Sequence, residues 1–143
     1  MMGIIFSIIA GAAMSFQGVI NTRLGEKIGL YEANAYVQGT AFILAIIAML
    51  MLGKGNIREI LSADKIYLTG GILGLIITIT VMLGIKDLSP LISISIILIS
   101  QLTVAAVIDA FGLLGTEKVA IGFTKIIGFV LMVAGVVLFK IKT

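Results

Sequence analysis

A single carboxylate, Asp109, lies well inside an apolar stretch of the sequence, and Gln101 occupies the middle of the same stretch. Acids inside hydrocarbon are costly, and they mark proton or cation sites or pair with a nearby base. On a helix, Asp109 lies roughly 12 Å from Gln101 along the axis, at about 1.5 Å per residue. Lys125 opens the next apolar stretch and is a candidate partner. The pattern predicts that Asp109 and Lys125 act in coupling or gating, with a purely structural ion pair as the alternative.

Four side-chain amides form two pairs with the same spacing, Gln17 with Asn21 and Asn34 with Gln38. Residues four apart share one face of a helix and lie about 40° apart around it. Because the lipid interior offers no partner to an amide, each pair must face another helix or a polar cavity. We expect these four amides, together with Gln101, to bind the substrate. Hydrogen bonds that hold the helices together are the alternative.

The positions of the charged residues divide the chain into five apolar stretches, each long enough for a membrane-spanning helix. Of the 143 residues, 60% are hydrophobic and only 12% are charged, whereas about 25% are charged in a typical soluble domain. A spanning helix needs about 20 apolar residues, and strands of a membrane barrel would alternate instead. The sequence therefore predicts an all-α fold, an integral membrane bundle of five transmembrane helices in one domain, residues 1–143. The expected spans are residues 3–22, 32–52, 67–85, 90–112 and 121–139.

Cysteine and histidine are both absent. Their absence removes disulfides, thiolate chemistry, the usual zinc sites and imidazole acid–base catalysis. We expect no enzyme activity, no catalytic residue, no metal and no cofactor.

The net charge of +3 is modest, and the basic residues lie between apolar stretches, which is typical of headgroup contact and not of nucleic-acid binding. Residues 3–22 exceed the apolar core of a signal peptide and no base precedes them, so we expect them to remain as the first span.

Lysine and arginine are divided evenly between the two sides of the predicted bundle. Side one, with the N-terminus and the loops after the second and fourth spans, carries Lys54, Arg58, Lys65 and Lys118, with Lys125 just inside the next span. Its count is therefore five bases, or four if Lys125 is taken as intramembrane. Side two carries Arg23, Lys27, Lys86, Lys140 and Lys142. Orientation normally follows the excess of these residues in short cytoplasmic loops, and here neither side has one. This balance indicates dual topology, with copies inserted both ways round; a partner that fixes the direction is the alternative.

Two copies in opposite orientations would form an antiparallel homodimer of ten helices. Many transporters combine two repeats of opposite topology around a site at the middle of the membrane, and five short helices can scarcely enclose such a site alone. In this dimer, Asp109 of one copy lies at the depth of the amides of the other. Gly128 and Gly135 lie seven residues apart in the last span, nearly on one stripe. We expect both glycines at the dimer interface, since small residues let helices approach closely.

Three stretches resemble known transporters. Residues 11–21, GAAMSFQGVIN, are similar to the opening of the YdcZ-type family, and so is the run from Gln101 to Gly115, which ends in DAFGLLG. This resemblance covers nearly the whole chain and implies a short five-helix protein of the drug/metabolite transporter superfamily. Residues 126–136 are similar to the last helix of small multidrug resistance transporters, in which a glycine heptad pairs two antiparallel subunits. Those exporters carry a glutamate in the first helix, whereas the first predicted span of this chain, residues 3–22, contains no acid.

The function that these features favour is a small transporter in the cell membrane (plasma or inner membrane), which it crosses several times. It would move a polar or amphiphilic small molecule by alternating access as a dimer, with a pathway lined by Gln17, Gln38 and Gln101. A flippase for a lipid-linked substrate is one alternative. A non-transporting scaffold, or a partner subunit of a heteromeric complex, is the other. The expected partners are a second copy, membrane lipids and a small-molecule substrate.

Overall fold

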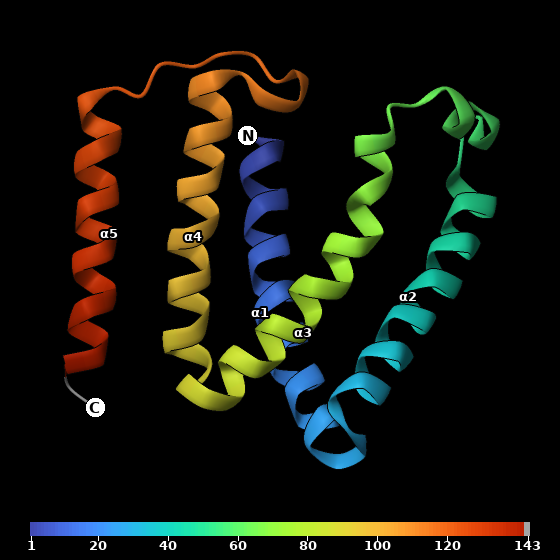
Figure 1. The fold of residues 1–143 in the computed structure, drawn as a ribbon, viewed down its shortest axis with the longest axis horizontal. Coiled ribbons are helices and arrows are strands. Elements are labelled where there is room, and N and C mark those ends of the chain that lie inside the picture. The colour runs from blue at the N-terminus through green and yellow to red at the C-terminus, as the bar shows by residue number, and fades with distance from the viewer. Residues whose placement is uncertain (142–143) are drawn as a thin grey trace. The chain divides into compact units, whose positions relative to one another are not determined.

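Helices account for nearly all of the chain. The computed structural model describes residues 1–141, with the Lys140 side chain excepted, and the structure is 88% helical. No strand occurs in residues 1–141, and this confirms the all-α class. Figure 1 shows the α-helices and the 3₁₀ segments that lie between them. Their bounds are α1 (Met2–Ile28), α2 (Leu30–Leu52), η1 (Ile57–Ser62), η2 (Lys65–Thr69), α3 (Gly70–Leu88), α4 (Pro90–Phe111), η3 (Leu113–Gly115) and α5 (Phe123–Ile141).

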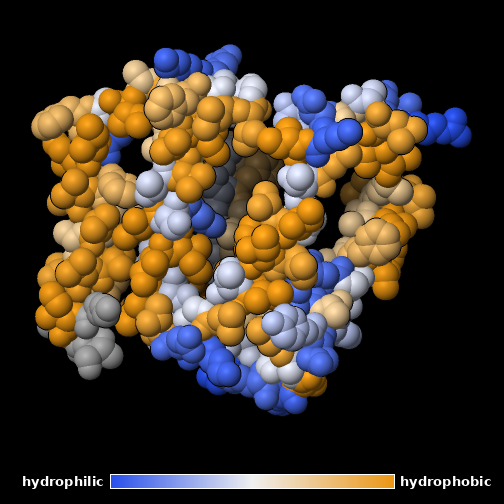
Figure 2. Space-filling view, viewed as in Figure 1, coloured by the Kyte–Doolittle hydropathy of each residue, from blue (hydrophilic) through white to orange (hydrophobic). Residues whose placement is uncertain are grey.

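Four helical segments of the described chain are long and apolar enough to cross a membrane. They are α1, α2, α4 and the continuous segment Lys65–Leu88. The apolar part of α5, Phe123–Phe139, is shorter; it covers roughly 26 Å of a hydrocarbon core that is about 30 Å thick. Figure 2 shows hydrophobic residues over the sides of the helices and hydrophilic residues gathered at helix ends. Such surfaces are stable in lipid or against another apolar helix, so four to five of these helices suit a membrane.

The helix α1 continues past the end of the predicted first span, residues 3–22. Its last turns are polar, and Arg23 Nη1 donates a hydrogen bond to Glu26 Oε2 at 2.9 Å. Gly29 ends the helix at a φ of +103°, which L side chains rarely adopt, and α2 begins at the next residue. A charged turn can extend a spanning helix because long side chains place their charges in the headgroup region. The apolar span and the helix therefore have different lengths.

Residues 1–87 form one compact unit, in which α3 packs against α1 at two glycines. A Cβ added at Gly18 would lie 2.8 Å from Ile85 Cδ1 and 3.1 Å from Val81 Cγ1. A Cβ added at Gly25 would lie 2.6 Å from Met82 Cε. The ends of these α3 side chains fit against α1 because the two positions carry no side chain of their own. The buried hydrophobic residues of the described chain are Ala33, Met82 and Ile85.

This close approach predicts that Gly18→Val destabilises the protein more than Gly11→Val does. Both glycines lie in α1, so the change in helix propensity is the same, but a Cβ at Gly11 would meet nothing within 4 Å. Overpacking at Gly18 is expected to lower the free energy of unfolding by about 1–3 kcal/mol. Thermal unfolding of the two purified variants measures the difference. Equal melting temperatures would contradict the described packing of α1 on α3.

The second unit begins at Leu88 and contains α4, η3 and α5. Pro90 occupies the first turn of α4, where its missing N–H breaks no helical hydrogen bond. Gly112 ends α4 in the left-handed conformation, with a φ of +63°. The loop then folds back onto the helix, because the Val119 N–H donates to the main-chain carbonyl of Asp109 at 2.8 Å. α5 runs beside α4 (Figure 1), so these two helices form a hairpin. The expected single domain stays a prediction.

Candidate functional site

The four predicted amides of residues 1–87 differ in burial. Asn21 and Asn34 are buried, Gln38 is half-buried and Gln17 is exposed. Gln38 Nε2 on α2 donates to Thr78 Oγ1 on α3 at 3.4 Å, which is a long hydrogen bond. One of the four amides therefore links two helices, as the interhelical alternative expects.

Asn34 is more deeply buried than Gln38. Its residue surface is 2% exposed, and within the described chain its Oδ1 accepts no hydrogen bond. On α1, Thr22 is also buried; its hydroxyl donates to the Gly18 carbonyl at 2.7 Å and reaches the Met82 carbonyl of α3 at 3.5 Å. The interior of this unit therefore contains polar side chains, and one of them has an unused acceptor.

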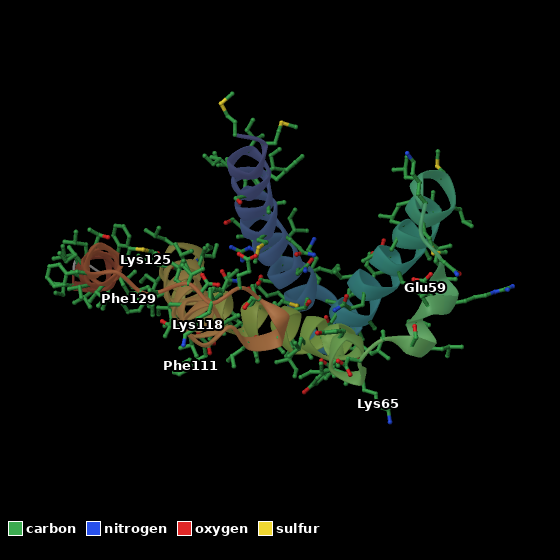
Figure 3. All side chains as sticks on the ribbon, turned by 90° about the horizontal axis from the view of Figure 1, so that it is seen from above. Glu59, Lys65, Phe111, Lys118, Lys125 and Phe129 are labelled. Carbon is green, nitrogen blue, oxygen red and sulfur yellow. The ribbon has the colours of Figure 1, made fainter. Side chains whose placement is uncertain are left out.

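Gln101 and Asp109 both lie exposed on α4. The Asp109 carboxylate has no hydrogen-bond or ion-pair partner among residues 1–141, although the main-chain carbonyl of the same residue accepts from Val119. Lys125 is exposed near the start of α5 (Figure 3), and its ammonium group lies more than 4.0 Å from the Asp109 carboxylate. The ion pair between these two residues is therefore not formed within one described chain.

The two glycines of the predicted interface have open space beside them. A Cβ added at Gly128 or at Gly135 would meet nothing within 4 Å in the described structure. Gly18 on α1 differs, because side chains of α3 already fill the space that a Cβ at Gly18 would need. The α5 glycines are therefore not needed for packing within the chain, and their face is open to another molecule.

Nearly the whole chain matches one family of known proteins. Residues 2–138 match the family model described as "Putative inner membrane exporter, YdcZ". The chain belongs to this YdcZ family. The match confirms the resemblance to YdcZ-type proteins and makes the chain a multi-pass inner-membrane protein and a membrane transporter of the drug/metabolite type. No curated protein and no solved structure gives a match.

Two structural features of this YdcZ-family chain, the Gly18 and Gly25 contacts with α3 and the buried Thr22, were not predicted from the sequence. Gly18 and Gly25 have the same seven-residue spacing as Gly128 and Gly135, and this spacing was the signal that could have found the contact with α3. Thr22 carried no such signal, because a threonine in an apolar helix commonly bonds to its own backbone. The hydrogen bond from Thr22 to the Gly18 carbonyl is of this kind.

The predicted site residues of the YdcZ-family chain fall into both compact units. Asn21, Asn34 and Gln38 lie in α1 and α2 of the first unit, and Gln17 lies on α1. Gln101 and Asp109 lie on α4, and Lys125 lies on α5, all in the second unit. Their convergence on one substrate pathway stays a prediction.

Proposed function

We propose that this YdcZ-family chain transports a polar or amphiphilic small molecule by alternating access, as a homodimer of two oppositely oriented copies. The observation that carries the proposal is the exposure of Gln17, Gln101 and Asp109 on helices that suit a membrane. Lipid tails neither donate nor accept hydrogen bonds, so each of these side chains is costly against hydrocarbon. A polar pathway formed with a second copy removes that cost.

The open face of α5 supports pairing with a second copy. Gly128 and Gly135 are nearly aligned along α5, about 20° apart around the helix axis, and the space beside each is unoccupied within the described chain. Close backbone approach through small residues is a common way for helices to pair in lipid, where burial of apolar surface provides no drive. We place these two glycines at the homodimer interface.

Opposite orientation brings the polar groups to a common depth. Asn21 and Asn34 lie near the turn between α1 and α2, which the predicted topology assigns to side two, whereas Asp109 lies near the end of α4, which it assigns to side one. Two antiparallel copies therefore place Asp109 of one copy level with the amides of the other. In this arrangement the amides bind the solute, Gln101 lies near the midplane, and Asp109 acts with Lys125 in coupling or gating.

A ligand screen on the purified protein tests the proposed pathway. Polar and amphiphilic solutes are scored by the rise in melting temperature that they cause, and a ligand at a hundred times its Kd stabilises by about 2.7 kcal/mol. We expect Gln101→Ala and Asp109→Asn to reduce the shift strongly, because both remove a group that faces the solute. Asp87→Asn is the matched control, since Asp87 is an exposed acid at the end of α3.

The outcome of this screen separates the proposal from its alternatives. A shift that survives in full in both Gln101→Ala and Asp109→Asn would remove the proposed site. Purification in an obligatory complex with a different chain would favour the heteromeric scaffold instead. A shift caused by lipid-linked solutes alone would favour the flippase.

A further inference from the structure

The interior of residues 1–87 is unusually polar. Asn21, Thr22 and Asn34 are 5%, 6% and 2% exposed, and they are as deeply buried as Met82 and Ile85. Buried positions in proteins normally favour apolar side chains, and asparagine is mostly exposed. Polar groups in a protected interior are stable only when each one has a hydrogen-bond partner. The hydrogen-bond partners of these buried side chains therefore indicate whether this interior is purely structural or binds a ligand.

Within the described chain, the Asn34 acceptor is without a partner. Its Oδ1 is fully covered and accepts no hydrogen bond. The Thr22 hydroxyl is committed to the Gly18 carbonyl at 2.7 Å, and the amide of Gln38 donates to Thr78. A buried acceptor left unpaired is costly, and a donor that enters this interior when the transport pathway opens would remove that cost. None of the described residues supplies that donor, so the Asn34 acceptor is available to a group from outside them.

We propose that Asn34 Oδ1 accepts a hydrogen bond from an N–H or O–H group of the transported molecule. The inference rests on the proposed transport function and specifies its substrate class: solutes with at least one donor, such as hydroxyl compounds and protonated amines. Fully methylated analogues, such as ethers and quaternary ammonium ions, leave the acceptor unpaired. Sites built to pair a substrate donor discriminate strongly against analogues that lack it.

Matched pairs of probes test this donor requirement. Benzyl alcohol is compared with benzyl methyl ether, and benzylamine with benzyltrimethylammonium, so that charge stays constant within each pair. Melting temperatures are recorded in lauryldimethylamine oxide, a detergent whose headgroup has no donor. We expect the donor-bearing member to bind at least about tenfold more tightly, a ratio that corresponds to the loss of one buried hydrogen bond.

Variants at Asn34 assign the effect to this acceptor. Asn34→Leu has a branched side chain without polar atoms, and Asn34→Ala is too small to clash; both should abolish the difference within each probe pair. Without ligand, Asn34→Leu should match or exceed the wild-type melting temperature, because it removes an unpaired acceptor. Thr40→Val is the control, since the Thr40 hydroxyl bonds to its own helix at 3.0 Å and 2.9 Å.

Three results would overturn the inference. The first is equal binding of the two members of every pair, or no donor-dependent shift in any pair. The second is a donor preference that survives in both Asn34 variants. The third is a lower ligand-free melting temperature in both variants, which would show that a buried water already satisfies Asn34. Any of these results combined with intact dependence on Asp109 and Gln101 would refute this inference and leave the transport proposal standing.

Discussion

Removing two lysines from one side of the membrane is expected to fix the orientation of the chain and to abolish its transport. Lys54→Gln with Lys65→Gln leaves three basic residues on side one against five on side two. Lys27→Gln with Lys86→Gln leaves five against three. Because the bases of short loops set orientation, each double variant should insert one way only, and the two should insert in opposite ways.

The decisive measurement is co-expression of the two double variants. Each one alone lacks an oppositely oriented partner, so transport should fall to background, and the two together should restore it. A cysteine introduced at Glu117 reports the orientation by labelling from outside the cell, and the chain has no other cysteine. The control variant Lys54→Gln with Lys27→Gln removes one lysine from each side and should keep activity. Full activity of either one-sided variant alone would contradict dual topology.

Replacing both glycines of the α5 stripe by leucine is expected to separate the two copies. Gly128→Leu with Gly135→Leu inserts two branched side chains where the proposal places the partner's α5. Within its own chain each new Cβ meets nothing within 4 Å, so the fold of the monomer should persist. We expect the dissociation constant of the dimer to rise about a hundredfold, which corresponds to roughly 2.7 kcal/mol.

Energy transfer between labelled copies in liposomes measures this dissociation as the protein is diluted in lipid. Ala134→Leu is the matched control, because Ala134 lies about 120° from the Gly128 position around the helix and should leave the dimer intact. Transport should fall in parallel with dimer content in the glycine variant. A dimer that persists in the Gly128 and Gly135 variant would remove α5 from the interface.

The sequence allowed the helices to be predicted better than their ends. Apolar length and charged breaks placed the fourth helix within a residue of its observed bounds, Pro90–Phe111, because proline starts it and Gly112 stops it. The first helix runs to Ile28, beyond the predicted span. Hydropathy indicates where a helix leaves the hydrocarbon layer, whereas the helix itself ends where the backbone can leave the helical conformation. For α1 this residue is Gly29, with a φ of +103°.

The candidate site was predictable as a set of residue types but not as contacts. Polar side chains inside apolar stretches are visible directly in the sequence, and this is how Asn34 and Asp109 were predicted as site residues. Whether Asn34 has a hydrogen-bond partner depends on how α1, α2 and α3 are rotated and how they cross. The spacing of polar residues along one helix does not determine this. The distance between Asp109 and Lys125 likewise depends on the path of the loop between α4 and α5. Gly112 and Leu114 turn this loop through left-handed conformations, and the Val119 N–H holds it against the Asp109 carbonyl.

Cross-linking of single cysteines tests the antiparallel pairing most directly. Two copies with tags of different size are co-expressed, one with Lys27→Cys at the α1 end on side two and one with Glu117→Cys in the loop on side one. Head-to-tail pairing predicts cross-links between the two different copies and none between identical ones. Cross-links only between identical copies, or a protein that stays monomeric in the membrane, would contradict the proposed dimer and the pathway built on it.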